Sequence, residues 1–225
     1  MASMYEQLMA LPLFQGVSSE RLSALVEKYP FHFLKFRAGE VIVEPDQPCT
    51  HVQFVVSGAA MAELRHRKLQ VVLRQLLPAP NVLAPHHLFG LETSYPFGVT
   101  AHGECGVLQL RKSDYVSMVQ ADKVFLFNIL NYLSLHTQRL RSSLLTMSRG
   151  SVVERLAIYV GTFTTQLSQQ VNLEYRQRDL CALLGVQRSV LTRTLDDLEQ
   201  QGIVAQQVGV VEFLDLPGLL ALALE

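Results

Sequence analysis

The chain has 225 residues, of which 49% are hydrophobic and 17% charged, and its formal net charge is −1. This composition indicates a globular protein with a substantial core and excludes a disordered chain. The net charge excludes a protein that binds nucleic acid non-specifically through an overall positive charge. No apolar run reaches the roughly 18 residues of a membrane span, and no signal peptide is expected. Three widely separated cysteines, Cys49, Cys105 and Cys181, predict a reducing, cytoplasmic location without disulfides or a metal cluster.

The first 120 residues are expected to form short helices and then a sheet. Residues 5–29 show helical spacing, with Ser18 or Ser19 as the cap. From about 31 to 120, hydrophobic residues recur with a period of two, which predicts an antiparallel sandwich or barrel of many short strands. Turns are expected between these short strands, at positions that include Gly39, Gly58, Gly103 and Gly106.

From about 114 to 148 the pattern becomes helical again. A short helix is expected first, and then a long one without Gly or Pro. The apolar seam of the long helix suits pairing with a second copy of the chain, because the helix is longer than one small barrel needs. The alternative is a helix that packs only on its own barrel. The seam consists of Leu126, Leu130 (or Ile129), Leu133, Thr137 (or His136), Leu140, Leu144 and Met147, of which Leu126, Leu130, Leu133, Thr137, Leu140 and Leu144 are expected at the dimer interface.

The C-terminal part is predicted to contain a helix-turn-helix motif. A helix in "SVVERLAIYVGTFTTQL" precedes it. Two further helices flank Gly185, which can adopt the positive φ of a tight turn, and Gly202 ends the second of them. The stretch "IVAQQVGVVEF" is then expected to form a two-stranded wing that turns at Gly209.

The second helix of this pair has the features of a DNA-reading helix. Arg188, Ser189, Thr192 and Arg193 share its outer side near its N-terminal end. An arginine fork fits guanine O6 and N7, and hydroxyl groups reach phosphates or base edges in the major groove. The alternative is a plain helical hairpin with solvated arginines. The inner face is expected to consist of Val190, Leu191, Thr194, Leu195 and Leu198.

The order of a β-roll, a long helix and a winged helix-turn-helix resembles the cyclic-AMP receptor protein/FNR family of bacterial transcription regulators. The resemblance is carried by "FRAGEVIVEPDQPCTHVQFVVSGAAMAEL", by "HLFGLE" and, most specifically, by "RDLCALLGVQRSVLTRTLDDLEQQGIV". It implies an α+β fold with an N-terminal antiparallel β-roll sensor (1–120, like a cyclic-nucleotide-binding jelly roll), a dimerisation helix (121–148) and a C-terminal winged helix-turn-helix (149–225). It also implies a homodimer on a palindromic DNA operator, a small-molecule effector, and RNA polymerase as a candidate partner.

The resemblance also assigns individual residues. Arg188, Ser189 and Arg193 match positions that read bases, and Arg178 and Gln187 match positions that touch phosphate. The family usually places Ser or Thr before each helix of the motif, whereas Arg176 and Gln187 stand there in this chain. An arginine side chain cannot accept the capping hydrogen bond, which predicts weaker helix starts or a different cap.

The stretch "APHHLFGLETSYPFGVTAH" (84–102) is the expected effector loop. Cyclic-nucleotide members of the family carry a Gly-Glu pair here for the ribose and an Arg for the phosphate. In this chain Leu91 follows Gly90, Phe97 stands where the Arg is expected, and the stretch has no Arg or Lys. A buried phosphate needs a cation, so we expect no affinity for cyclic AMP or cyclic GMP. The three cysteines are not clustered, so no iron–sulfur centre is expected.

Three alternatives therefore remain for the effector: an apolar or weakly polar small molecule, a haem, or no ligand. Haem would use His86 or His87 as its axial ligand beside an apolar wall. The alternative is that the histidine pair only caps a loop. The candidate pocket consists of His86, His87, Phe89, Gly90, Glu92 and Phe97.

Two other classes of protein are alternatives to a transcription regulator. A regulatory module could bind a small ligand or haem without binding DNA. A cupin-type enzyme shares the β-roll shape, but it needs two histidines and a carboxylate at metal-ligand spacing. The seven histidines of this chain do not have that spacing. No catalytic residue and no metal site other than the haem option is therefore predicted. The residues do not give the effector, the operator, the regulated genes, or the choice between activation and repression.

Overall fold

The structure, a computed structural model, describes residues 4–164 and 168–222, with the side chains of residues 4, 5 and 139–149 outside the description. The chain forms two compact units. The first comprises Met1–Met61 and Leu77–Thr137, and the second comprises Ala62–Leu76 and Gln138–Glu225. Within the described part of the chain, every helix is too short or too polar to cross a membrane.

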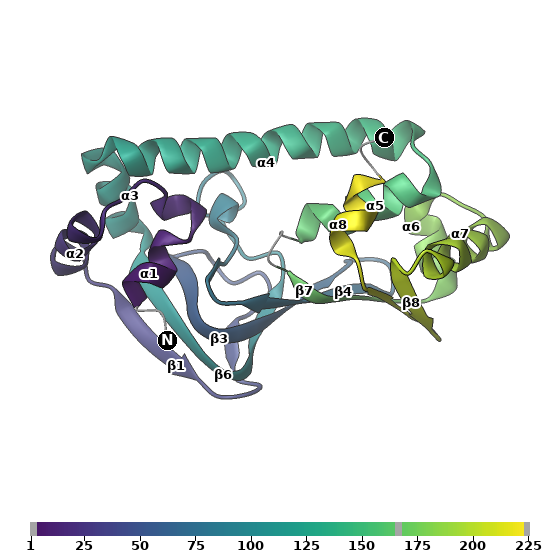
Figure 1. Cartoon of the computed structure of the whole chain (residues 1–225), viewed down its shortest axis with the longest axis horizontal. Coiled ribbons are helices and arrows are strands. Elements are labelled where there is room, and N and C mark those ends of the chain that lie inside the picture. Colours follow the sequence, from purple (N-terminus) through teal and green to yellow (C-terminus); the bar gives the residue numbers. More distant parts are fainter. Residues whose placement is uncertain (1–3, 165–167, 223–225) are drawn as a thin grey trace. The chain divides into compact units, whose positions relative to one another are not determined.

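Short helices open the first unit: α1 (Met4–Met9), η1 (Pro12–Phe14) and α2 (Ser19–Lys28) (Figure 1). Ser18 is the cap of α2, because its hydroxyl oxygen accepts a hydrogen bond from the N–H of Arg21. The buried ring of Phe14 meets Phe54 and Phe125 edge-on, at centroid distances of 5.4 and 5.5 Å. These contacts fix the N-terminal helices on the core of the unit.

The β-roll of the first unit is antiparallel, as predicted. Strand β6 (Gly98–Arg111) pairs with β1 (His32–Phe36) and with β2 (Val41–Val43). Strand β3 (His51–Arg65) pairs with the short β5 (Asn81–Val82) and lies next to β6. Helices α3 (Lys112–Ala121) and α4 (Lys123–Arg149) follow β6, in agreement with the helical pattern of the sequence.

The prediction of many short strands was wrong for β3 and β6. Gly58 lies inside β3, and Gly103 and Gly106 lie inside β6, although turns were expected at all three. Gly58 has a φ of +70°, and a Cβ there would collide with the carbonyl oxygen of Glu104 on β6. Gly58 therefore permits a close approach of β3 to β6, and none of the three glycines ends its strand.

Among the described residues, the second unit contains a sheet, the C-terminal part of α4 and four further helices. The sheet order is β4 (Val71–Pro78), β7 (Gln169–Tyr175), β9 (Val210–Phe213) and β8 (Val204–Gln207). Strand β4 continues from the hairpin that it forms with β3, and its residues Val71–Leu76 belong to this unit. The further helices are α5 (Val152–Phe163), α6 (Gln177–Leu184), α7 (Arg188–Gln200) and α8 (Leu216–Ala221).

One hydrophobic core joins the sheet of the second unit to its helices. It includes Val71 and Leu73 of β4 together with Leu156 of α5, Leu180 of α6 and Leu195 of α7, each at most 2% exposed. The hairpin end of β3–β4 is therefore packed into the same core as the helix-turn-helix. Neither β7 nor α8 was predicted from the sequence.

Candidate functional site

Helices α6 and α7 form the predicted helix-turn-helix around Gly185. This glycine has a left-handed backbone with a φ of +64° and ends α6. The Nη1 of Arg155, on α5, donates a hydrogen bond of 2.7 Å to the carbonyl oxygen of Leu184. The N–H of Val186 donates to the carbonyl oxygen of Cys181 at 3.0 Å. The turn is thus fixed from two sides, which fixes where α7 begins.

The side chains predicted to touch DNA are exposed on one outer surface of α6 and α7. The side-chain amide of Gln177 donates a hydrogen bond of 3.3 Å to the hydroxyl oxygen of Thr192, which joins the two helices on this surface. The buried side of α7 is formed by Leu191, Leu195 and Leu198. The exposed predicted residues are Arg178 on α6, Gln187 before α7, and Arg188, Ser189, Thr192 and Arg193 on α7.

One residue of the predicted inner face is misplaced. Val190 is 44% exposed, although its neighbour Leu191 is buried. Successive helical residues lie about 100° apart around the axis, so Val190 falls on the flank of the buried stripe. The prediction that Val190 packs inward was wrong, and its side chain borders the outer surface of α7.

The starts of α6 and α7 have no side-chain cap, as their sequences predicted. Arg176 and Gln187 occupy the two N-cap positions. The start of α6 instead contacts the hairpin end of β3–β4. The N–H of Arg176 donates to the carbonyl oxygen of Gln70 at 3.0 Å, and the N–H of Gln70 donates to Oδ2 of the buried Asp179 at 3.1 Å. These two bonds anchor the start of α6 to the hairpin.

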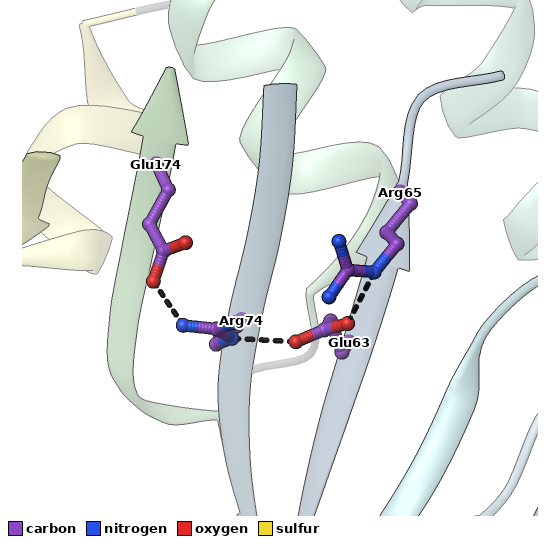
Figure 2. A network of polar contacts seen from close by, with 4 residues as sticks. All are labelled: Glu63, Arg65, Arg74 and Glu174. Carbon is purple, nitrogen blue, oxygen red and sulfur yellow. Dashed lines mark hydrogen bonds and ion pairs between the residues drawn. The ribbon is translucent and has the colours of Figure 1, made fainter. Parts of the chain in front are cut away.

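A chain of ion pairs runs across the three strands next to α6 (Figure 2). The Nε of Arg74 on β4 lies 2.6 Å from Oε2 of Glu63 on β3, and its Nη1 contacts Glu174 on β7. The Nε of Arg65 lies 2.6 Å from Oε1 of the same Glu63. Burial raises the pKa of Glu63, but the hydrogen bonds and charges of Arg74 and Arg65 outweigh it and leave the pKa below its ordinary value.

The wing is attached to α7 through Gln206 of β8. Its backbone N–H donates to Oε1 of Glu199 at 2.7 Å, and its side-chain amide donates to Oδ1 of Asp196 at 3.1 Å. These bonds orient the β8–β9 hairpin relative to the exposed side of α7. The hairpin turns at Gly209, as predicted, and Val208 beside it is fully exposed.

The expected effector loop brings its two histidines against α4. His86 and His87 lie in a helical turn, η2 (Pro85–His87). The ring of His86 lies 4.5 Å from that of His87 and stacks on that of His136, with centroids 4.1 Å apart. Tyr132 stacks on the same ring at 6.4 Å. The Nδ1 atom of His86 is buried and has no hydrogen-bond partner.

The other candidate pocket residues lie elsewhere on the loop. Phe89 is 37% exposed, with the Lys112 ammonium 5.4 Å from its ring centre. Gly90 and Glu92 are exposed and Phe97 is half-buried. None of the six candidate residues lines the hollow of about 580 Å³ in the first unit. That hollow is lined by Pro48, Cys49, Thr50, Thr93, Lys112, Ser113 and Val116. Among the described residues, no three His, Cys, Asp or Glu side chains are placed to hold a metal ion.

The predicted seam of α4 is largely solvent-exposed over its first half. Leu126 and Leu130 are 38% and 48% exposed, whereas Phe125 and Ile129, about 100° away around the helix axis, are buried. Leu133 is half-buried and Thr137 is exposed. Leu140, Leu144 and Met147 lie outside the described side chains. Helix α4 therefore presents one apolar face to its own unit and a second apolar face that its own unit leaves uncovered.

Comparison with known proteins agrees with the helix-turn-helix and with the fold described above. A family model described as a Crp-like helix-turn-helix domain matches residues 138–222. A nitrogen fixation regulation protein, FixK of Azorhizobium caulinodans, is 26% identical over 179 residues, which cover 76% of this chain and 70% of that protein. The fold is similar to that of the catabolite activator protein of Thermus thermophilus, with a TM-score of 0.52 and 21% identity, over 95% of this chain and 99% of that one.

Proposed function

We propose that this chain, which belongs to the cyclic-AMP receptor protein/FNR family of transcription regulators, acts as a homodimer that reads a palindromic DNA operator through α7. The observation that carries the proposal is the exposure of Arg188, Ser189 and Arg193 on one side of a helix whose other side is anchored in a core. Its homologues are regulators and not enzymes. We assign no catalytic residue.

Within this proposal the residues of the DNA surface have separate roles. Arg188 and Arg193 lie within the first two turns of α7 and would reach base edges in the major groove, with Ser189 and Thr192 beside them. Arg178, on α6, would bind a backbone phosphate, and Gln187 would do so at the start of α7. The wing, held by Gln206, would flank the same groove.

The dimer is proposed to form through the exposed stripe of α4. Leu126 and Leu130 would be covered by the same residues of a second copy, since a two-fold axis pairs identical surfaces. The stripe continues to the exposed Thr137 and, in the sequence, to Leu140 and Leu144. Two α7 helices would then contact half-sites one helical turn of DNA apart. With DNA as the main partner, we place the protein in the cytoplasm, with RNA polymerase as a candidate partner.

The effector is proposed to be something other than a cyclic nucleotide. The stretch 84–102 contains no Arg or Lys, and the half-buried Phe97 stands where the family has its phosphate-binding arginine. A nucleotide phosphate placed there would lose its water without gaining a counter-ion. Calorimetry with cyclic AMP should therefore show no binding at micromolar concentrations, and a micromolar affinity would overturn this part of the proposal.

The proposed function is tested by selecting DNA fragments from the source genome with the purified protein. We expect recovered fragments to share an inverted repeat with half-site centres about ten base pairs apart. The matched control is the Arg188→Ala/Arg193→Ala variant, which keeps the buried side of α7 and should recover no common site. Random recovery by the wild-type protein would contradict sequence-specific binding.

A further inference from the structure

The cluster of three imidazoles between η2 and α4 has no role in the DNA surface or among the exposed seam residues of α4. His86 lies between His87 on its own helical turn and His136 on α4, at centroid distances of 4.5 and 4.1 Å. All three residues belong to the first unit. The contact therefore attaches the expected effector loop to the helix that we propose for dimerisation.

The surroundings of His86 accept only the neutral ring. The titratable side chains that face it are His87 on η2 and Tyr132 and His136 on α4. No described carboxylate forms an ion pair with His86, and its buried Nδ1 has no partner. A proton on His86 would be a buried charge without a counter-ion, placed between two further imidazole rings. Burial, together with the charges of His136 and His87, lowers the pKa of His86 to about 3.

We propose that His86 is a proton-binding site that releases η2 from α4 in acid, so that the proton is an effector of the sensor unit. In the docked loop the ring of His86 stays neutral because of its stacked neighbours. In the undocked loop the ring meets water and binds a proton at its ordinary pKa of about 6.5. The undocked state therefore binds more protons, and each pH unit below that value shifts the population toward it by up to about tenfold.

A change at η2 acts on α4 because His136 and Tyr132 lie on that helix. Undocking removes the stacked ring from one side of α4, close in sequence to the seam residues Leu133, which is half-buried, and Thr137, which is exposed. The effect on DNA binding rests on the proposed function. The binding of the proton is independent of that function, and it is measured without DNA.

The test is hydrogen–deuterium exchange of the full-length protein without DNA, with labelling times corrected for the intrinsic pH dependence of exchange. Between about pH 7.5 and pH 5.5 we expect the protection of peptides that cover Pro85–His87 to fall about tenfold. The variants His86→Phe and His86→Gln carry no titrating ring at this position and should show no such fall. The control His102→Gln, at an exposed histidine of β6, should behave like the wild type.

Two results would overturn the proposal: constant protection of η2 in the wild type, or an equal loss of protection in the His86 variants. An NMR titration supplements them. The ring signal of His86, assigned by its absence from His86→Gln, should stay that of a neutral imidazole well below pH 6. A titration of this ring near about pH 6.5 would also contradict the proposal. Failure of the DNA selection would leave these readouts unchanged, so the two proposals fail separately.

Discussion

The backbone N–H of Gln70 donates a hydrogen bond of 3.1 Å to Oδ2 of Asp179, although 109 residues separate them in the chain. Gln70 lies at the end of the β3–β4 hairpin, and Asp179 lies in the first turn of α6. The hairpin that begins in the β-roll therefore ends as part of the helix-turn-helix unit. Beside this bond, Val71 pairs with Tyr175 and Val72 with Glu174.

Removing the Asp179 carboxylate should destabilise the second unit. Asp179→Ala leaves the N–H of Gln70 without its charged acceptor, and we expect the free energy of unfolding to fall by about 1–2 kcal/mol. Asp179→Asn retains an acceptor oxygen and should lose less. The control is Arg178→Ala, because Arg178 is 84% exposed and its pair with Asp179 at 3.4 Å is worth little. Urea unfolding measures all three, and equal stability of Asp179→Ala and the wild type would refute this role.

Arg74 should make the stability of the protein depend on pH through Glu63. A carboxylate whose folded pKa is lowered stabilises the protein above its unfolded pKa, here about 4.5, and this stabilisation is lost as the pH falls through the folded value. Arg74→Ala should therefore lower the free energy of unfolding by about 1 kcal/mol at neutral pH, because the pairs are partly exposed. The difference from the wild type should shrink below pH 4.5. Arg65→Ala, at a more exposed partner of Glu63, should have a smaller effect, and a pH-independent difference in chemical unfolding would contradict the mechanism.

A charge on the exposed seam of α4 should prevent dimerisation. Leu130 is 48% exposed, so Leu130→Glu should leave the fold of the single chain intact, while in a dimer it would bury an unpaired charge at a cost of several kcal/mol. We expect sedimentation to show a monomer for this variant and a dimer for the wild type at micromolar concentration. Leu135→Glu is the matched control, since Leu135 is 54% exposed but lies off the stripe. A wild-type monomer, or a Leu130→Glu dimer, would rule out this interface.

The features that the sequence predicted correctly are local. The helix-turn-helix follows from helical periodicity interrupted by Gly185 and Gly202, which both have positive φ in the structure. The cap at Ser18 and the wing turn at Gly209 also depend on neighbours within a few residues. Such features are visible in a sequence because their backbone requirement falls on one residue type.

The features that the sequence analysis missed depend on distant partners or on weak patterns. The sequence favours a turn at Gly58, because nothing nearby in the chain reveals its close approach to the backbone of Glu104. The alternation of Val171, Leu173 and Tyr175 is a short and weak strand signal, and these residues form part of β7. The pairing of β4 with β7 and the stacking of His86 on His136 join segments far apart in the chain, so periodicity could not show them.

The central claim is that α7 reads DNA bases, and a competition binding experiment with Arg188→Ala tests it most directly. Affinities for the selected operator and for unrelated DNA are measured at several salt concentrations. We expect Arg188→Ala to lose about 1–3 kcal/mol of operator preference per half-site. Arg178→Ala, the matched phosphate-contact control, should weaken both DNAs equally and reduce the salt dependence by about one unit per half-site. If Arg188→Ala keeps the full operator preference of the wild type, α7 is not the helix that reads the operator.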